Sequence, residues 1–387
     1  MTDSIMTGQF ITELKIQDFK LWDEMKEKRA CFSFTLELTA RCNNNCTHCY
    51  INLPPNDAGA RERELNADQI MDIADQAIAL GAIWCNITGG EPLLRPDFTE
   101  IYLGLKKKGL LVSVMTNATL IHEEHVALFR RYPPRDIEIT VYGVTKETYE
   151  AVSRIPGSYD AFMQGLTLLQ DAGVKIRLKS MAIHSNLHET DKIAEFCRAR
   201  TKDYYRFDPQ LHLRMDHDPI RNEEIRNERL TPKEVVALEA ADPDRREALA
   251  NGCDRMIIPE FCNISCNHLF HCGAGIGDFV VSPDGMMRLC MSLCHHDCIY
   301  DLTTGTLADA WYNFIPKVRD MHSDDTTFLE TCRKCPIINL CLWCPAHADI
   351  ETGLLDGSVD YFCSVAHARA GSLGYTGTKP NFTTTEP

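Results

Sequence analysis

The feature that most constrains this chain is the number and distribution of its cysteines. The 387 residues include 18 cysteines, and twelve of these fall between positions 253 and 370. Reduced cytosolic thiols have no disulfides to form, so this density indicates metal binding. A disulfide framework usually belongs to a short secreted chain with a weak core, whereas this chain is long and 44% hydrophobic. The C-terminal third is therefore predicted to be held together by metal.

Charge and hydropathy exclude several classes of protein. The formal net charge of −15 argues against binding the phosphate backbone of a nucleic acid, which requires clustered Lys and Arg. No apolar run has the length of a membrane span, and the polar start MTDSIMTGQF lacks the order of a secretory signal. We expect a cytoplasmic protein with no nucleic-acid or membrane partner.

The first half of the chain alternates short apolar runs with segments of helical period. This pattern is typical of repeated βα units and predicts a parallel sheet. One helix is well signalled, because Asn66 can cap it, Gln69 can reach back to that cap, and Gly81 can end it. Six strands predict a partial (β/α)6 TIM-like barrel, with the strands at 32–38, 83–87, 110–115, 137–142, 174–183 and 205–213.

Composition divides the chain into five parts. An N-terminal segment (1–30) precedes the barrel (31–215), and a charged segment (216–252) reads as a helical connector. The cysteine-rich second domain spans 253–370. The Gly-, Thr- and Pro-rich residues 371–387 are expected to form a disordered tail.

Three cysteines follow the first predicted strand within eight residues. Cys42, Cys46 and Cys49 offer three soft thiolates, which suit zinc or iron–sulfur and leave one metal position open. A structural zinc site is the competing interpretation, but such a site needs four closed ligands. His48 adjoins Cys49, which makes it a poor fourth ligand for a tetrahedral ion.

The spacing Cys-x3-Cys-x2-Cys, followed by Tyr50, resembles the signature of the radical S-adenosylmethionine (SAM) superfamily. The resemblance implies that the three cysteines bind a [4Fe–4S] cluster whose open iron is chelated by SAM. Reductive cleavage of SAM would then give a 5′-deoxyadenosyl radical.

A second motif, Thr88-Gly-Gly-Glu-Pro92, resembles the GGEP motif of the same family. Glycines without Cβ atoms would let the backbone approach a ligand, and a carboxylate beside them can accept hydrogen bonds from an ammonium group. Taken alone, the motif would be read as a tight turn. The residues expected to contact SAM are Tyr50, Gly89, Gly90, Glu91, Pro92, Thr116, Asn117 and Thr140.

The C-terminal cysteines resemble a SPASM domain, which carries auxiliary clusters on many radical SAM enzymes. The resemblance implies two further [4Fe–4S] clusters, although only two residues separate Cys341 from Cys344 where the family usually has three. One cluster would use Cys266, Cys272, Cys290 and Cys344. The other would use Cys332, Cys335, Cys341 and Cys363.

For the paired Cys-x2-Cys units, a zinc ribbon is the alternative to iron–sulfur clusters.

Several other cysteines belong to neither set. Cys31, Cys85 and Cys197 stand in apolar or helical contexts and are expected to be small buried side chains. Cys253, Cys262, Cys294 and Cys298 remain without an assigned role.

The resemblance implies a radical SAM enzyme that modifies a ribosomally made peptide or protein, by a crosslink, a thioether or a side-chain oxidation. Its partners would be that substrate, a reductase, flavodoxin or ferredoxin as electron donor, and a separate leader-binding protein. The alternatives are radical oxidation of a small molecule or a step in building a cofactor and, in another class, a non-catalytic iron–sulfur or zinc protein. No catalytic acid or base is assigned, although His184, Asp208 and Arg214 fall near predicted strand ends.

Overall fold

The computed structural model describes residues 29–203, 205–256, 267–341 and 343–374. Within these residues the chain forms one nine-stranded sheet in the order β6-β5-β4-β3-β2-β1-β7-β8-β9. The first six strands are parallel and follow one another in sequence order, as predicted. They are β1 (Ser33–Glu37), β2 (Trp84–Thr88), β3 (Leu111–Thr116), β4 (Asp136–Thr140), β5 (Ile176–Met181) and β6 (Arg206–Asp208).

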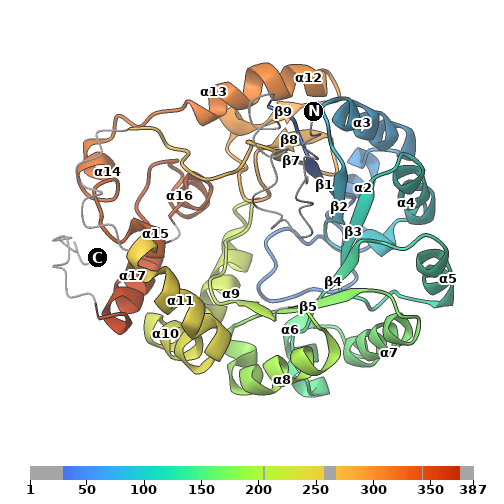
Figure 1. Cartoon of the computed structure of the whole chain (residues 1–387), viewed down its shortest axis with the longest axis horizontal. Helices are drawn as coiled ribbons and strands as arrows, with labels where there is room; N and C mark the ends of the chain where they lie inside the picture. Colours follow the sequence, from blue (N-terminus) through green and yellow to red (C-terminus); the bar gives the residue numbers. More distant parts are fainter. Residues whose placement is uncertain (1–28, 204, 257–266, 342, 375–387) are drawn as a thin grey trace, which may run out of the picture.

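Helices follow the parallel strands and lie around the outside of the curved sheet (Figure 1). Alternate strand residues such as Phe34, Ile87 and Val114 are buried in the hydrophobic core. The intervening residues line a cavity on the inner face, among them Thr88, Glu138 and Lys179. The helices are α2 (Ala58–Arg63), α3 (Ala67–Ala79), α4 (Phe98–Lys107), α5 (Glu123–Arg131), α6 (Lys146–Ser153), α7 (Ser158–Asp171) and α8 (Thr190–Arg200).

The predicted start of α3 is confirmed. Asn66 caps the helix and forms a reciprocal capping box with Gln69. Gly81, just beyond the end of the helix, has a φ of 107°, which favours glycine. Ile70 and Ile73 of this helix are buried.

The cysteine-rich region continues the barrel sheet, which the sequence pattern did not predict. Strand β7 (Asp278–Val281) pairs parallel with β1, and β8 (Met286–Arg288) and β9 (Tyr300–Asp301) follow antiparallel. A buried ion pair between Glu37 on β1 and Arg288 on β8 joins the two regions. These strands have only two to four residues each, so their periodicity is too short to be recognised in the sequence.

The charged connector forms three helices, α9 (Pro219–Glu228), α10 (Pro232–Ala241) and α11 (Pro243–Met256). The buried Glu239 of α10 pairs at 2.8 Å with the buried Arg369 of α17 (Asp360–Ser372), which ties the connector to this C-terminal helix. The remaining helices are α12 (Leu307–Asp309), α13 (Ile315–Arg319), α14 (Thr326–Glu330), α15 (Ile338–Cys341), α16 (Pro345–Thr352) and α17 (Asp360–Ser372).

Helix α17 extends to Ser372, slightly beyond the expected start of the tail at Gly371. Most of the predicted tail and of the N-terminal segment lies outside the described residues. In the part of the chain that is described, no helix has both the length and the apolar character of a membrane span.

Candidate metal and cofactor site

The three-cysteine loop follows β1 and borders the cavity inside the sheet. Cys42 and Cys46 are buried and Cys49 is half-buried, and all three line a cavity of about 860 Å³. The backbone of the loop is fixed by hydrogen bonds from Asn45 N to Ser153 O (2.9 Å) and from Thr47 N to Val152 O (3.0 Å). The loop therefore presents its thiols to the cavity from a firmly bonded backbone.

Two arginines also hold this loop. Arg214 donates to Cys49 O at 3.3 Å and to Asn52 Oδ1 at 2.9 Å. Arg221 donates to Cys46 O at 3.0 Å. Arg214, considered above for proton transfer, is buried and bonded to Asp216 at 2.5 Å, so its contacts are structural. The contacts of these arginines with the loop had no recognisable signal in the sequence, because each spans more than 160 positions.

The two glycines of the GGEP motif pack against the segment that leads into the cysteine loop. A Cβ atom on Gly90 would lie 2.6 Å from the carbonyl oxygen of Ala40 and closer still to that of Arg41. Gly90 N donates to Thr39 O at 2.7 Å, and Gly89 has a φ of 132°. Both glycines line the cavity. In the structure, the backbone of residues 39–41 approaches both glycines closely, which leaves no room for a Cβ atom at either position.

Glu91 is completely buried and lies outside the cavity lining. Its carboxylate accepts hydrogen bonds from Leu93 N (3.1 Å), Thr116 Oγ1 (2.8 Å) and Asn117 N (2.8 Å). Burial raises the pKa of Glu91 to about 7. Its oxygens are thus directed to protein donors, and it joins the GGEP turn to the end of β3. Pro92, also buried, begins the short 3₁₀ turn that follows.

The other expected SAM contacts converge on the cavity. Tyr50, Thr116, Asn117 and Thr140 all line it. Asn117 Nδ2 lies 3.8 Å from the sulfur of Cys42, which connects the end of β3 with the cysteine loop.

The cavity wall contains buried polar atoms that lack a hydrogen-bond partner among the described residues. They include the Asn44 amide group, Gln210 Nε2, and Nδ1 of His48, His212 and His347. Burial lowers the pKa of both His48 and His212 to about 4, so these rings are neutral. Because buried polar groups in native proteins are normally hydrogen-bonded, this wall fits a polar ligand.

The spacing of the sulfurs fits a cluster better than a single ion. A tetrahedral zinc ion with Zn–S bonds of ~2.3 Å would bring its sulfurs to roughly 3.8 Å from one another. In the described part of the chain, no three Cys, or Cys and His, have ligand atoms all within 4.8 Å of one another. Burial raises the pKa of the Cys42 and Cys46 thiols, and the nearby Cys49 raises both pKa values further. An iron–sulfur cluster binds its thiolates on separate irons and does not require the sulfurs to lie that close together.

The C-terminal cysteines gather into two sets. Cys272 and Cys344 line the main cavity. Burial raises the pKa of Cys290 and of Cys344, and Cys272 lies near enough to both thiols to raise these pKa values further. Cys266, expected to be the fourth member, lies outside the described residues. Cys344 therefore lies near Cys272 and Cys290, although only two residues separate it from Cys341. A separate cavity is lined by the complete second set, Cys332, Cys335, Cys341 and Cys363.

The remaining cysteines are placed as follows. Cys31, Cys85 and Cys197 are fully buried in the core, as predicted. Cys294 lies 3.9 Å from Nη1 of Arg288, and Cys298 is buried with its sulfur 3.8 Å from that of Met321. Cys262 and the side chain of Cys253 are outside the described part.

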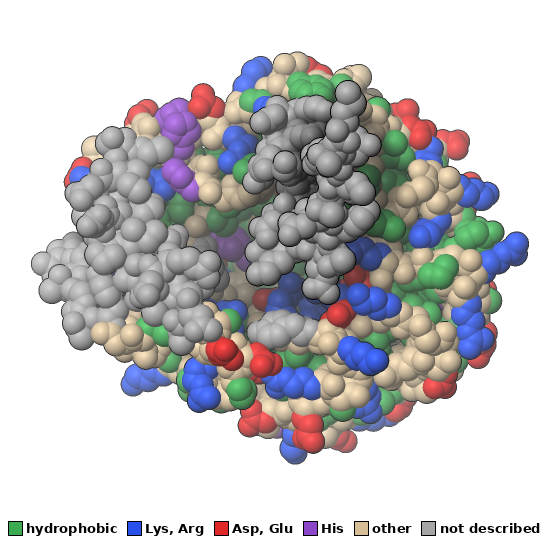
Figure 2. Space-filling view, viewed as in Figure 1, with side chains coloured by type: hydrophobic (Ala, Val, Ile, Leu, Met, Phe, Trp, Pro, Cys, Tyr) green, Lys and Arg blue, Asp and Glu red, His purple; other side chains and the backbone are tan. Residues whose placement is uncertain are grey.

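The charged residues of the cavity are largely paired with one another. Lys179 is bonded to Glu138, and Asp208 lies 3.6 Å from Arg206. His184 is not on this wall, because it is bonded to Asn227 O at 2.9 Å and to Glu234 at 3.3 Å. Figure 2 shows several Lys and Arg side chains near the centre of this face, with Asp and Glu side chains among them.

Comparison with known proteins agrees with this geometry. Residues 36–197 match the model of the radical SAM superfamily. The chain therefore contains a radical SAM domain, formed by the parallel strands that carry the cysteine loop.

The particular relatives include enzymes and biosynthesis proteins. The antilisterial bacteriocin subtilosin biosynthesis protein AlbA of Bacillus subtilis is 28% identical over 265 residues, which cover 66% of this chain and 54% of AlbA. The AdoMet-dependent heme synthase of Methanosarcina barkeri is 30% identical over 162 residues, covering 42% of this chain and 46% of that protein. The matches thus span about half the length of these relatives.

A solved structure shares the fold over most of the chain. Streptococcus suis SuiB bound to its precursor peptide SuiA matches with a TM-score of 0.66 and 14% identity, covering 88% of this chain and 78% of SuiB. The similarity confirms the predicted fold class, a partial α/β barrel followed by a cysteine-rich C-terminal region.

Proposed function

We propose that this protein is a radical SAM enzyme that abstracts hydrogen from a peptide or protein substrate. The observation that carries the proposal is the shared cavity. Cys42, Cys46 and Cys49 line one part of it, and Cys272 and Cys344 of the C-terminal region line another. A substrate in this cavity would lie between two groups of cysteines suited to redox clusters.

Different residues of the barrel would hold the cluster and SAM. Cys42, Cys46 and Cys49 would hold a [4Fe–4S] cluster, and the cavity beside them would hold SAM. When bound, this pair supplies a 5′-deoxyadenosyl radical on reduction. The backbone at Gly89 and Gly90, together with the polar side chains of Tyr50, Thr116, Asn117 and Thr140, would orient SAM. Glu91 acts indirectly, because its carboxylate fixes the end of β3.

Position matters more than acid–base chemistry in such a reaction. The firmly bonded loop and the ion-paired cavity wall would hold the reacting carbon near the radical and exclude competing groups. The C-terminal sets would hold auxiliary [4Fe–4S] clusters, one on Cys266, Cys272, Cys290 and Cys344, and one on Cys332, Cys335, Cys341 and Cys363. These clusters would deliver or accept an electron. A flavodoxin, ferredoxin or reductase would supply the reducing electron, and a separate protein would bind a leader peptide.

Two observations favour a peptide over a small molecule. The match to AlbA extends over 66% of this chain, beyond the share matched by the heme synthases. The cavity of about 860 Å³ is also at the large end of the range of ~300–1,000 Å³ for ligand pockets. A small-molecule substrate is the second candidate, because two heme synthases match 42% and 43% of the chain.

The first experiment is anaerobic reconstitution followed by iron counting and assay of 5′-deoxyadenosine from SAM under a strong reductant. About twelve irons are expected for three full clusters. Cys42→Ala should abolish 5′-deoxyadenosine, whereas Cys85→Ala, which removes a buried core thiol, should retain it. Zinc in place of iron, with no SAM cleavage in the intact protein, would refute the proposal.

The second experiment distinguishes the substrates. Synthetic peptides encoded by short reading frames beside the gene would be compared with Fe-coproporphyrin III as the small-molecule probe. A peptide that stimulates 5′-deoxyadenosine formation and changes mass supports the peptide proposal. Conversion of the porphyrin, with no change in any peptide, would favour the second candidate.

A further inference from the structure

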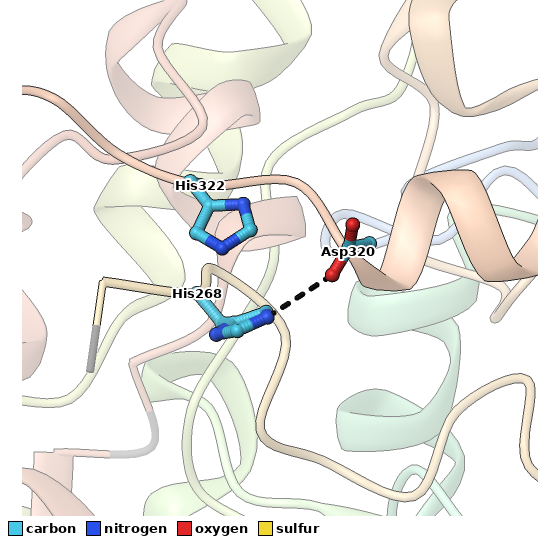
Figure 3. A group of neighbouring side chains, drawn as sticks. All are labelled: His268, Asp320 and His322. Atoms are coloured by element: carbon cyan, nitrogen blue, oxygen red, sulfur yellow. Dashed lines mark hydrogen bonds and ion pairs between the residues drawn. The ribbon is translucent and has the colours of Figure 1, made fainter.

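We infer that His268, Asp320 and His322 form a binding site for a divalent transition-metal ion of the zinc class, separate from the cysteine sets. The ligand atoms of the three side chains all lie within 4.8 Å of one another. Figure 3 shows the two imidazole rings facing each other, with the Asp320 carboxylate beside His268. This inference is independent of the reaction proposed above.

The backbone dictates this convergence. Leu269 N donates to Met321 O at 2.8 Å, and Ser323 N donates to Asn267 O at 2.9 Å, so the two segments form a short antiparallel ribbon. Residues 268 and 322 are paired between these bonds. Such a non-hydrogen-bonded pair brings opposite side chains closest together, on one face of the ribbon. The rings accordingly have centroids 4.0 Å apart.

Asp320 caps the C-terminal end of α13 (φ −88°, ψ 6°), and the chain turns there into the ribbon segment that carries His322. Its Oδ1 lies 3.1 Å from Nε2 of His268. Two imidazoles and one carboxylate are borderline donors that suit zinc and its neighbours, and water can complete the shell of a three-ligand site. The exposure of Asp320 and His322 gives an ion direct access.

The ribbon adjoins the first C-terminal cysteine set. Arg319, next to Asp320, donates to the carbonyl oxygen of Cys272 at 3.0 Å. The carbonyl oxygen of His268 accepts hydrogen bonds from Arg333 and His271. An ion bound across residues 268 and 322 would cross-link the two segments and fix the backbone that leads to Cys272. The proposed role of the ion is therefore structural: it would hold the segment from His268 to Cys272 against residues 320–322.

The test uses the full chain with its clusters reconstituted anaerobically and then equilibrated with Zn²⁺ alone. The intact protein should bind one zinc equivalent that His322→Asn and Asp320→Asn lose, with affinity falling at least roughly 10–100-fold, the loss that even outer-shell changes cause. His122→Asn, at another exposed histidine with a histidine neighbour, is the matched control and should keep the ion. Equal iron contents will show that all variants are folded.

Zinc-edge X-ray absorption separates this site from the cysteines. We expect nitrogen and oxygen at about 2.0–2.1 Å and no sulfur at about 2.3 Å. Hydrogen exchange of residues 267–275 should slow when zinc is added to the intact protein, and should not change in His322→Asn. Zinc that is bound through sulfur, or retained in both His322→Asn and Asp320→Asn, would overturn the inference.

Discussion

Substituting Gly90 by alanine should damage the cysteine loop from a distance. The added Cβ would lie 2.6 Å from the carbonyl oxygen of Ala40 and 2.7 Å from the carbonyl carbon of Arg41. Real Cβ atoms essentially never approach closer than 3.0 Å, and the Arg41 carbonyl oxygen would lie nearer than either of these atoms, so the backbones must separate by more than 0.4 Å. All three obstacles are backbone atoms, which cannot rotate away as a side chain can.

The displaced segment leads directly into Cys42. Overpacking of this kind costs about 1–3 kcal/mol of unfolding free energy. Because a misplacement of about 1 Å can lower a rate by roughly 10²-fold, we expect at least a tenfold loss of 5′-deoxyadenosine formation. Reduced iron binding by the barrel should accompany this loss.

Gly371→Ala is the matched control. Gly371 lies in α17 with no atom within 4 Å of an added Cβ, and alanine is the better helix former by about 1 kcal/mol. Denaturant unfolding, iron content and 5′-deoxyadenosine would be measured for both variants under anaerobic conditions. If Gly90→Ala matches the intact protein in all three, then the glycines do not position the loop and our reasoning is wrong.

Three other outcomes follow from the structure. Arg288→Met leaves Glu37 buried without its partner and should cost about 3–5 kcal/mol of unfolding free energy. Adding Glu37→Gln should recover part of that loss, and a double variant no more stable than Arg288→Met would contradict this. Cys341→Ala should lose the iron of one cluster, about four atoms, and should keep 5′-deoxyadenosine formation, because its cavity is separate from that of the cysteine loop. Burial, together with the charge of Arg229, lowers the pKa of His212 to about 4, so the native state favours the neutral ring. The contribution of His212 to the free energy of unfolding should be fully present above pH ~6.5, the pKa in the unfolded state, and should be lost as the pH falls towards 4. Urea unfolding at pH 7 and pH 5 should therefore show a smaller loss of stability in His212→Gln than in the intact protein.

Local patterns predicted the elements that depend on neighbouring residues. The alternation of apolar runs and helical segments gave all six parallel strands to within a few residues, apart from β6, which is much shorter than the predicted 205–213. The Asn66 cap and the buried Cys31, Cys85 and Cys197 were also predicted. These features depend on short-range periodicity and on the chemistry of single side chains, both of which can be read directly from the sequence.

Contacts between distant segments could not be predicted in this way. The orientation of Glu91 toward Thr116 and Asn117, rather than toward the cavity, depends on how β2 and β3 align. The extension of the sheet by β7 depends on its parallel pairing with β1 across more than 240 residues. The pairing of His268 with His322 likewise arises only when two remote segments form a ribbon.

The sequence by itself therefore determined the class of fold and the chemical types of the donors, because the period of hydrophobic residues and the spacing of thiols are local properties. The spacing of Cys42, Cys46 and Cys49 was sufficient to predict a metal-binding set. Only the tertiary structure decided which groups share a space. It brought Cys272 and Cys344 to the cavity of the cysteine loop and directed Arg214 to the loop carbonyls. These contacts depend on how whole helices and strands pack against one another, and that packing cannot be read from a local sequence pattern.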